Sequence, residues 1–171
     1  MLAYMRTANL AALPLLLACA TAEAQIAPKD TSYSCAVEFA AGLRYNGRTK
    51  KWEGAKFKPE AKFVLRMKYL RSMAGKEHSG KDEPAQLFDV TTTKAGSSTA
   101  LPCENPLEPS GSVAIGGDEV EFDCLGANLQ EFKFNLKTNR FLAIYAIGYV
   151  DGTNNNADNP TLSGGTCTKI D

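Results

Sequence analysis

The sequence predicts a single-domain antiparallel β-barrel or sandwich of about eight strands, preceded by a cleaved signal peptide. Three observations support this: short segments that alternate between apolar and polar residues, turn-forming residues between them, and an even number of cysteines after export. The chain has 171 residues, which suits one domain with its own hydrophobic core. We expect a signal peptide at 1–24, a flexible lead-in at 25–32 and the β domain at 33–171.

The first residues carry the features of an export signal. Residues 10–18 are apolar but too few to span a bilayer, and Ala22-Glu-Ala24 has the small residues of a cleavage site. An alternative stays open, because residues 16–19 resemble a bacterial lipobox in which Cys19 would be lipidated. We favour simple secretion, periplasmic or extracellular, over a lipid-anchored envelope protein. No later apolar run is long enough for a transmembrane helix.

The first strands can be placed from alternation and one turn signal. Residues 33–39 alternate, and Asn46-Gly47 is a strong hairpin signal. The return strand contains Trp52, the single tryptophan, which we interpret as a core or barrel-end residue rather than a ligand-stacking one. The inward face of the first strand comprises Tyr33, Cys35, Val37 and Phe39.

The middle of the chain is less uniform. Residues 60–74 fit either a strand or a helical face, and we choose a strand because the surrounding elements are all β. Further strands are expected at 86–93, at 112–115 and at 118–124. The last of these places Val120, Phe122 and Cys124 inward and Glu119, Glu121 and Asp123 outward.

A hairpin is expected at 132–150, with a polar turn at 137–140 in which Asn139 tolerates a positive φ. The second strand, from Phe141 to Val150, is apolar on both faces and therefore needs cover on both sides. A second sheet, a helical 60–74 segment or a homodimer through this strand would provide it, and an exposed Ile144 would mark a partner surface. We predict four buried residues here: Phe141, Ile144, Tyr145 and Ile147. A short last strand is expected at 164–170.

Removal of the signal peptide leaves four cysteines, which form two disulfides by default in an oxidising compartment. Four cysteines allow three connectivities. We prefer Cys35–Cys167 with Cys103–Cys124, because the first pair would tie the first strand to the last and close a long loop. The chain has no C-x-x-C motif, and the wide spacings and single histidine argue against a structural zinc site.

Charge is balanced overall but uneven along the chain. The net charge is zero, which offers no argument for nucleic-acid binding. Residues 44–81 nevertheless hold twelve basic and three acidic side chains, whereas 82–171 hold five and thirteen. We prefer mutual neutralisation across strands, and the alternative is a basic patch for lipid head groups or an envelope polyanion. The patch would contain Arg44, Arg48, Lys50, Lys51, Lys56 and Lys58.

Catalytic signatures are sparse. The sole histidine, His78, lies in a charged segment without an evident orienting frame, and the common hydrolase and nucleotide motifs are absent. The acidic row at 119–123 is interpreted as a solvated strand face. The Asn-rich segment 151–159 does not fit the EF-hand register, so we expect no metal and no cofactor. Asp151 and Asp158 remain the candidates for a carboxylate-based hydrolase.

Several short motifs resemble those of a family of small exported proteobacterial proteins of unknown function. This resemblance covers most of the mature chain and implies a periplasmic location without an assigned activity or site. A looser likeness is to periplasmic β-barrel inhibitors of lysozyme, which also begin near a Tyr-x-Cys, although their Ser-Gly-x-x-Tyr loop is missing here. We therefore expect a non-enzymatic binding or inhibitor module, with the hydrolase as the alternative. The motifs are Tyr33-x-Cys35, Leu43-x-Tyr45-Asn46, Trp52, Arg140-Phe-Leu142, Gly148-Tyr-Val-Asp-Gly152 and Gly165-Thr-Cys-Thr-Lys-Ile170.

Overall fold

The computed structural model describes residues 28–74, 84–107, 111–116, 120–126 and 129–171. Within these ranges all regular structure is β, and β1 begins at Thr31, just inside the expected lead-in. The strands are β1 Thr31–Asn46, β2 Lys51–Phe57, β3 Lys62–Met73, β4 Ala85–Lys94, β5 Leu101–Glu104, β6 Val113–Gly116, β7 Glu121–Gly126, β8 Gln130–Asn135, β9 Arg140–Tyr145 and β10 Thr161–Lys169.

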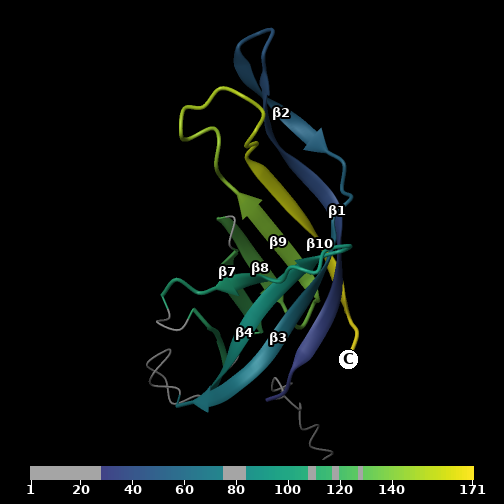
Figure 1. Ribbon diagram of the computed structural model, residues 1–171, viewed down its shortest axis with the longest axis vertical. Coiled ribbons are helices and arrows are strands. Elements are labelled where there is room, and N and C mark those ends of the chain that lie inside the picture. The colour runs from purple at the N-terminus through teal and green to yellow at the C-terminus, as the bar shows by residue number, and fades with distance from the viewer. Residues whose placement is uncertain (1–27, 75–83, 108–110, 117–119, 127–128) are drawn as a thin grey trace, which may run out of the picture.

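Eight of these strands form a closed antiparallel barrel in the order β1–β10–β9–β8–β7–β5–β4–β3 (Figure 1). The barrel closes because β1 pairs with β10 along one edge and with β3 along the other. The remaining two strands are additions, β2 pairing with β1 and β6 with β4. The predicted fold class, a single-domain antiparallel β-barrel or sandwich of about eight strands, is confirmed, and of the two architectures the structure is a barrel.

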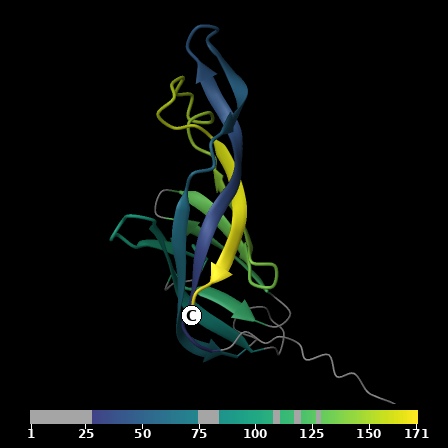
Figure 2. The same cartoon turned by 90° about the vertical axis from the view of Figure 1, so that its right-hand side faces the viewer.

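Strand β1 is 16 residues long and changes partners along one edge. Thr31–Ala36 pair with β3, whereas Ala40–Asn46 pair with β2. The β1–β2 hairpin therefore leaves the barrel and projects beyond its end, as two perpendicular views show (Figures 1 and 2). A β-bulge separates the two halves, because Glu38 has no partner between the pairs Val37–Gly165 and Phe39–Gly164.

The bulge corrects the predicted inward face of β1. Tyr33 and Cys35 are buried as expected and Val37 is half-buried. Phe39, however, is 50% exposed. One extra residue shifts the alternation of the strand, so the residues that follow it change face.

The barrel interior is filled by aromatic and aliphatic side chains. Phe134 packs edge-on against Tyr33 and lies near Phe122, with ring centroids 5.1 Å and 5.8 Å away. Burial of these rings contributes to hydrophobic stabilisation of the barrel. The largest fully buried side chains are Phe88, Phe134, Leu65, Ile115, Val90, Val113 and Cys35.

The ambiguous segment 60–74 forms β3 and no helix, as predicted. Leu65 and Met67 are buried in the core, and the whole strand pairs with β4. The predicted strands at 86–93 and 112–115 correspond to β4 and β6. Phe122 and Cys124 of β7 are buried as expected, Val120 is half-buried, and Glu121 and Asp123 are exposed.

The hairpin of β8 and β9 turns where predicted, with Asn139 at φ 55°, but β9 ends at Tyr145. Phe141 is buried as expected, whereas Ile144, Tyr145 and Ile147 are only half-buried. The predicted burial of these three is wrong: the described residues provide no second layer over the outer face of β9, where Ile144 lies, Tyr145 is the last residue of the strand, and Ile147 lies beyond it. The chain instead enters a turn at 147–152.

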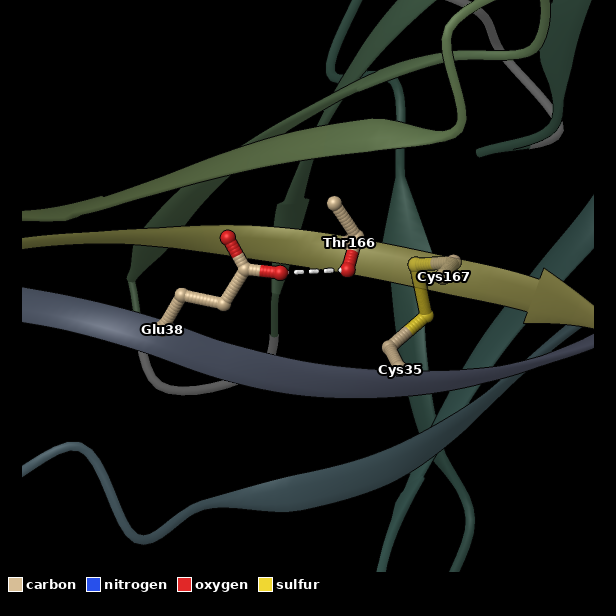
Figure 3. The surroundings of a disulfide bond; sticks show 4 residues. All are labelled: Cys35, Glu38, Thr166 and Cys167. Carbon is tan, nitrogen blue, oxygen red and sulfur yellow. Dashed lines mark hydrogen bonds between the residues drawn. A yellow bond between two sulfur atoms is a disulfide. The ribbon is translucent and has the colours of Figure 1, made fainter.

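Both preferred disulfides are present. Cys35–Cys167 joins directly paired residues of β1 and β10, and Cys103–Cys124 joins β5 to β7. Next to the first bridge, the hydroxyl of Thr166 donates a hydrogen bond of 2.5 Å to Glu38, the bulge residue (Figure 3). The strands at the two ends of the domain are thus held together by a covalent bond and a side-chain hydrogen bond.

We predict that the two disulfides differ in their contribution to stability. They span 132 and 21 residues, and the loop-closure model assigns them about 5 and about 3 kcal/mol. Replacing both members of each pair by alanine and measuring urea unfolding should show the larger loss for Cys35–Cys167. Equal losses would contradict the prediction.

Candidate functional site

The projecting β1–β2 hairpin carries five of the six residues of the predicted basic patch, and the sixth, Lys58, follows β2 directly. All six are exposed. Pairing places Arg44 and Lys51 on one face of the hairpin and Lys56 on the other, while Arg48 and Lys50 occupy the turn. The structure brings the predicted residues together, but as a positively charged projection with two faces and not as one flat patch.

The turn of this hairpin lies where Asn46-Gly47 predicts it, but its geometry differs. The loop has four residues, and the left-handed conformation is adopted by Lys50, with φ 56°. The side-chain oxygen of Asn46 accepts hydrogen bonds from the backbone N–H groups of Arg48 and Thr49. This Asx-type turn orders the tip that displays the cationic side chains.

One carboxylate, Glu53, lies on the hairpin. Its Oε1 accepts hydrogen bonds from the amide of Asn46 and the hydroxyl of Thr49, each 3.0 Å long, so it stabilises the turn. Lys58 forms an ion pair with Glu60. Within the described ranges the other five basic residues form no ion pair, so their charges remain available to a ligand.

The connection between β9 and β10 braces the hairpin. The side chain of Asn156 accepts a hydrogen bond from the backbone N–H of Tyr45 and donates one to its carbonyl, both 2.9 Å long. Asn156 thus takes the place of a neighbouring strand where β10 no longer pairs with β1. The indole N–H of Trp52 donates to the side-chain oxygen of Asn154 over 3.0 Å.

Aromatic rings complete this support. Trp52 lies between Tyr45 and Tyr149, with ring centroids 5.6 Å and 5.8 Å away. Trp52 is half-buried and packs on the hairpin, which corrects its predicted place in the core or at the barrel end. The sequence suggested no role for Tyr149 or the two asparagines, because an Asn-rich segment has no recognisable partner until the fold is known.

The two candidate hydrolase residues help to fold this same connection. Asp151 accepts a hydrogen bond from the backbone N–H of Thr153, and Asp158 accepts one of 2.7 Å from the hydroxyl of Tyr145. Both carboxylates are exposed. Their contacts explain them as loop-stabilising residues, and the geometry adds nothing to the hydrolase alternative.

Several side-chain oxygens of the Asn-rich segment 151–159 also accept hydrogen bonds from protein donors. Among the residues that the structure describes, no group of three or more His, Cys, Asp or Glu side chains could hold a metal ion.

The acidic row of β7 faces β8. Asp123 pairs with Lys133 over 3.5 Å, and Glu121 accepts a hydrogen bond from Asn135. These contacts fit a solvated strand face, as interpreted from the sequence. Glu119, His78 and Cys19 lie outside the described residues.

Comparisons with models of known protein families, with curated proteins and with solved structures gave no match. The family resemblance and the likeness to lysozyme inhibitors therefore stay predictions. The described part of the chain contains no helix long and apolar enough to cross a membrane.

We predict that Asn156→Ala loosens the hairpin without unfolding the barrel. Losing both bonds to Tyr45 removes about 1–1.5 kcal/mol, so exchange of the Tyr45 amide hydrogen should be roughly tenfold faster. Asn155→Ala is the matched control, because among the described residues the side chain of Asn155 bonds only within its own turn, to the backbone N–H of Ala157. Unchanged exchange at Tyr45 in Asn156→Ala would refute the brace.

The Tyr145–Asp158 contact predicts a pH effect. The hydrogen bond to Asp158, with smaller contributions from burial and nearby carboxylates, raises the pKa of Tyr145 above its ordinary value of 10.0. Its stabilising effect is therefore present below pH 10 and is lost as the pH rises through the titration of Tyr145. Asp158→Asn should shift this titration to lower pH, as measured by tyrosinate absorbance with Tyr145→Phe as the reference.

Proposed function

We propose that this protein is an exported, non-enzymatic binding module whose β1–β2 hairpin binds an anionic ligand of the cell envelope. The observation that carries the proposal is the set of five exposed cationic side chains on a braced projection, free of ion pairs within the described ranges. Lipid head groups and acidic polysaccharides share the required chemistry, which is a high density of negative charge.

The geometry of the hairpin supports binding in two ways. Its cationic groups extend beyond the barrel on both faces, so a polyanion can contact several of them at once. The backbone that displays them is held by Asn156 and by Trp52, so less conformational entropy is lost on binding. Because buried side chains fill the barrel interior, we place the binding site on this outer surface.

Export is supported by the signal-like N-terminus and by the two disulfides. The structure contains both disulfides, and such bonds persist mainly in oxidising compartments. These features support a periplasmic or secreted location, and lipidation at Cys19 would place the same domain at an envelope membrane. An inhibitor would use the same pre-organised hairpin against an acidic surface of a partner protein.

The proposal can be tested by neutralising the hairpin. The first variant changes five residues to glutamine: Arg44, Arg48, Lys50, Lys51 and Lys56. A matched control neutralises five exposed basic residues away from the hairpin: Lys62, Arg66, Lys68, Lys94 and Lys137.

Binding is measured by co-sedimentation with phosphatidylglycerol vesicles and by titration with an acidic polysaccharide. We expect the hairpin variant to bind at least about tenfold more weakly than wild type, because each basic group near an anionic surface contributes roughly 1 kcal/mol. The control should stay within about threefold, and salt should weaken binding because it screens exposed charges. Equal losses in both variants, or no wild-type binding, would refute the proposal.

A further inference from the structure

The outer surface of the barrel is apolar where β1, β10 and β9 run side by side. Water-facing positions of antiparallel sheets are normally polar, yet here Phe39 is 50% and Leu162 41% exposed. Exposed apolar clusters of this kind mark interaction surfaces. We call this surface the apolar face, and its residues are Phe39, Ala41, Leu142, Ile144, Leu162 and Gly164.

Two features of the fold create the apolar face. The bulge at Glu38 turns Phe39 outward, and Gly164 leaves room for its ring. A Cβ at Gly164 would lie 2.5 Å from Cζ of Phe39, so only glycine lets the ring lie against the sheet. An aromatic side chain held over glycine in this way presents a flat apolar surface to the outside.

The strand register shows that the two ends of the apolar face carry opposite charges. Lys56 of β2 pairs with Ala41, Ala41 with Leu162, Leu162 with Ile144, and Ile144 with Glu131 of β8. Directly paired residues point to the same side of a sheet. One row across five strands thus has three apolar residues in its middle, a lysine at one end and a glutamate at the other.

We propose that a second copy of this chain covers the apolar face in a two-fold dimer whose axis runs parallel to β10. This rotation places the row of one copy against the same row of the partner, running in the opposite direction, as an isologous interface requires. Leu162 then meets the partner's Leu162, and Ala41 meets the partner's Ile144. Lys56 meets the partner's Glu131 at each end, so both charged ends are complementary.

The neighbouring row is also self-complementary in size. Phe39 pairs with Gly164 and Gly164 with Leu142. The same rotation places Phe39 against the partner's Leu142, with the Phe39 ring of each copy lying over its own Gly164. Each copy therefore contributes an aromatic ring and a leucine to a second set of apolar contacts beside the first row.

The charges at the ends remain available for such contacts. Lys133 bridges both Glu131, over 3.1 Å, and Asp123, over 3.5 Å, so two carboxylates share one ammonium group and the β7–β8 side stays net negative. Lys56 has no ion pair within the described ranges. The two barrel surfaces curve away from each other on both sides of β10. Only long side chains such as lysine and glutamate can therefore reach across to the partner at the two ends of the row.

Charge also favours a second copy over a membrane. One flank of the apolar face is basic, but the other carries Glu121, Asp123 and Glu131, which an anionic lipid surface would repel. The six residues of the apolar face make a small interface, so the dimer should be weak, with a dissociation constant in roughly the micromolar range. This inference does not depend on the proposed function of the hairpin.

The first test changes Leu162, the residue at the centre of the proposed interface. Leu162→Asp should weaken dimerisation at least about thirtyfold, the usual cost of removing a central contact. Leu107→Asp is the matched control, because Leu107 is an exposed leucine far along the chain from the apolar face and should leave dimerisation unchanged. Sedimentation equilibrium of the full chain between about 1 and 300 μM covers the expected range.

The second test exchanges the charges. Lys56→Glu and Glu131→Lys should each weaken the dimer by about tenfold, and the double variant should return to within about threefold of wild type. Near-ultraviolet circular dichroism checks that each variant is folded. Wild type that stays monomeric throughout the range, or additive losses without recovery in the double variant, would overturn the proposal. So would a monomer whose binding to neutral or anionic vesicles is abolished by Leu162→Asp, since lipid would then be the occupant.

Discussion

Closure of the barrel depends on β1 having a partner along each edge, and the Cys35–Cys167 bond secures the junction with β10. Cys35 and Cys167 are directly paired residues, so the bond fixes the register between the first and last strands. Register errors of one residue would exchange the inner and outer faces of a strand. The ring packing around Phe134 and the position of the hairpin both follow from this junction.

The bulge at Glu38 separates two parts of β1 with different roles. Before it, the strand belongs to the barrel and buries Tyr33 and Cys35. After it, the strand pairs with β2 and leaves the barrel. The bulge also turns Phe39 outward, so this one extra residue lies where the projecting hairpin begins and adds an aromatic ring to the apolar face. The hydrogen bond from Thr166 to Glu38 holds the bulge against β10.

The packed interior explains why both proposed surfaces lie outside the barrel. Rings from opposite walls meet, such as Phe63 with Phe132 and Phe141, at centroid distances of 5.9 and 5.1 Å. The hairpin and the apolar face differ in physical character: one is a cationic projection that attracts charge over a distance, and the other is a flat apolar surface that gains energy by excluding water. Lys56 belongs to both, since it lies on the hairpin and ends the row centred on Leu162.

The sequence by itself determined most strands and the membership of the basic hairpin, and it left the connectivity of the two disulfides as a preference among three. Alternation with a period of two is a local property of the sequence. The hairpin at Asn46-Gly47 could likewise be predicted from neighbouring residues alone, without knowledge of a distant partner. Only the tertiary structure decided that Phe39 faces outward, that β9 ends at Tyr145 and that Asn156 braces Tyr45. These outcomes depend on pairings between remote residues: Tyr45 and Asn156 are 111 positions apart, and the bulge is defined only against β10. A local pattern of apolar and polar residues does not identify such partners. The contacts that select them form only when distant parts of the chain come together during folding.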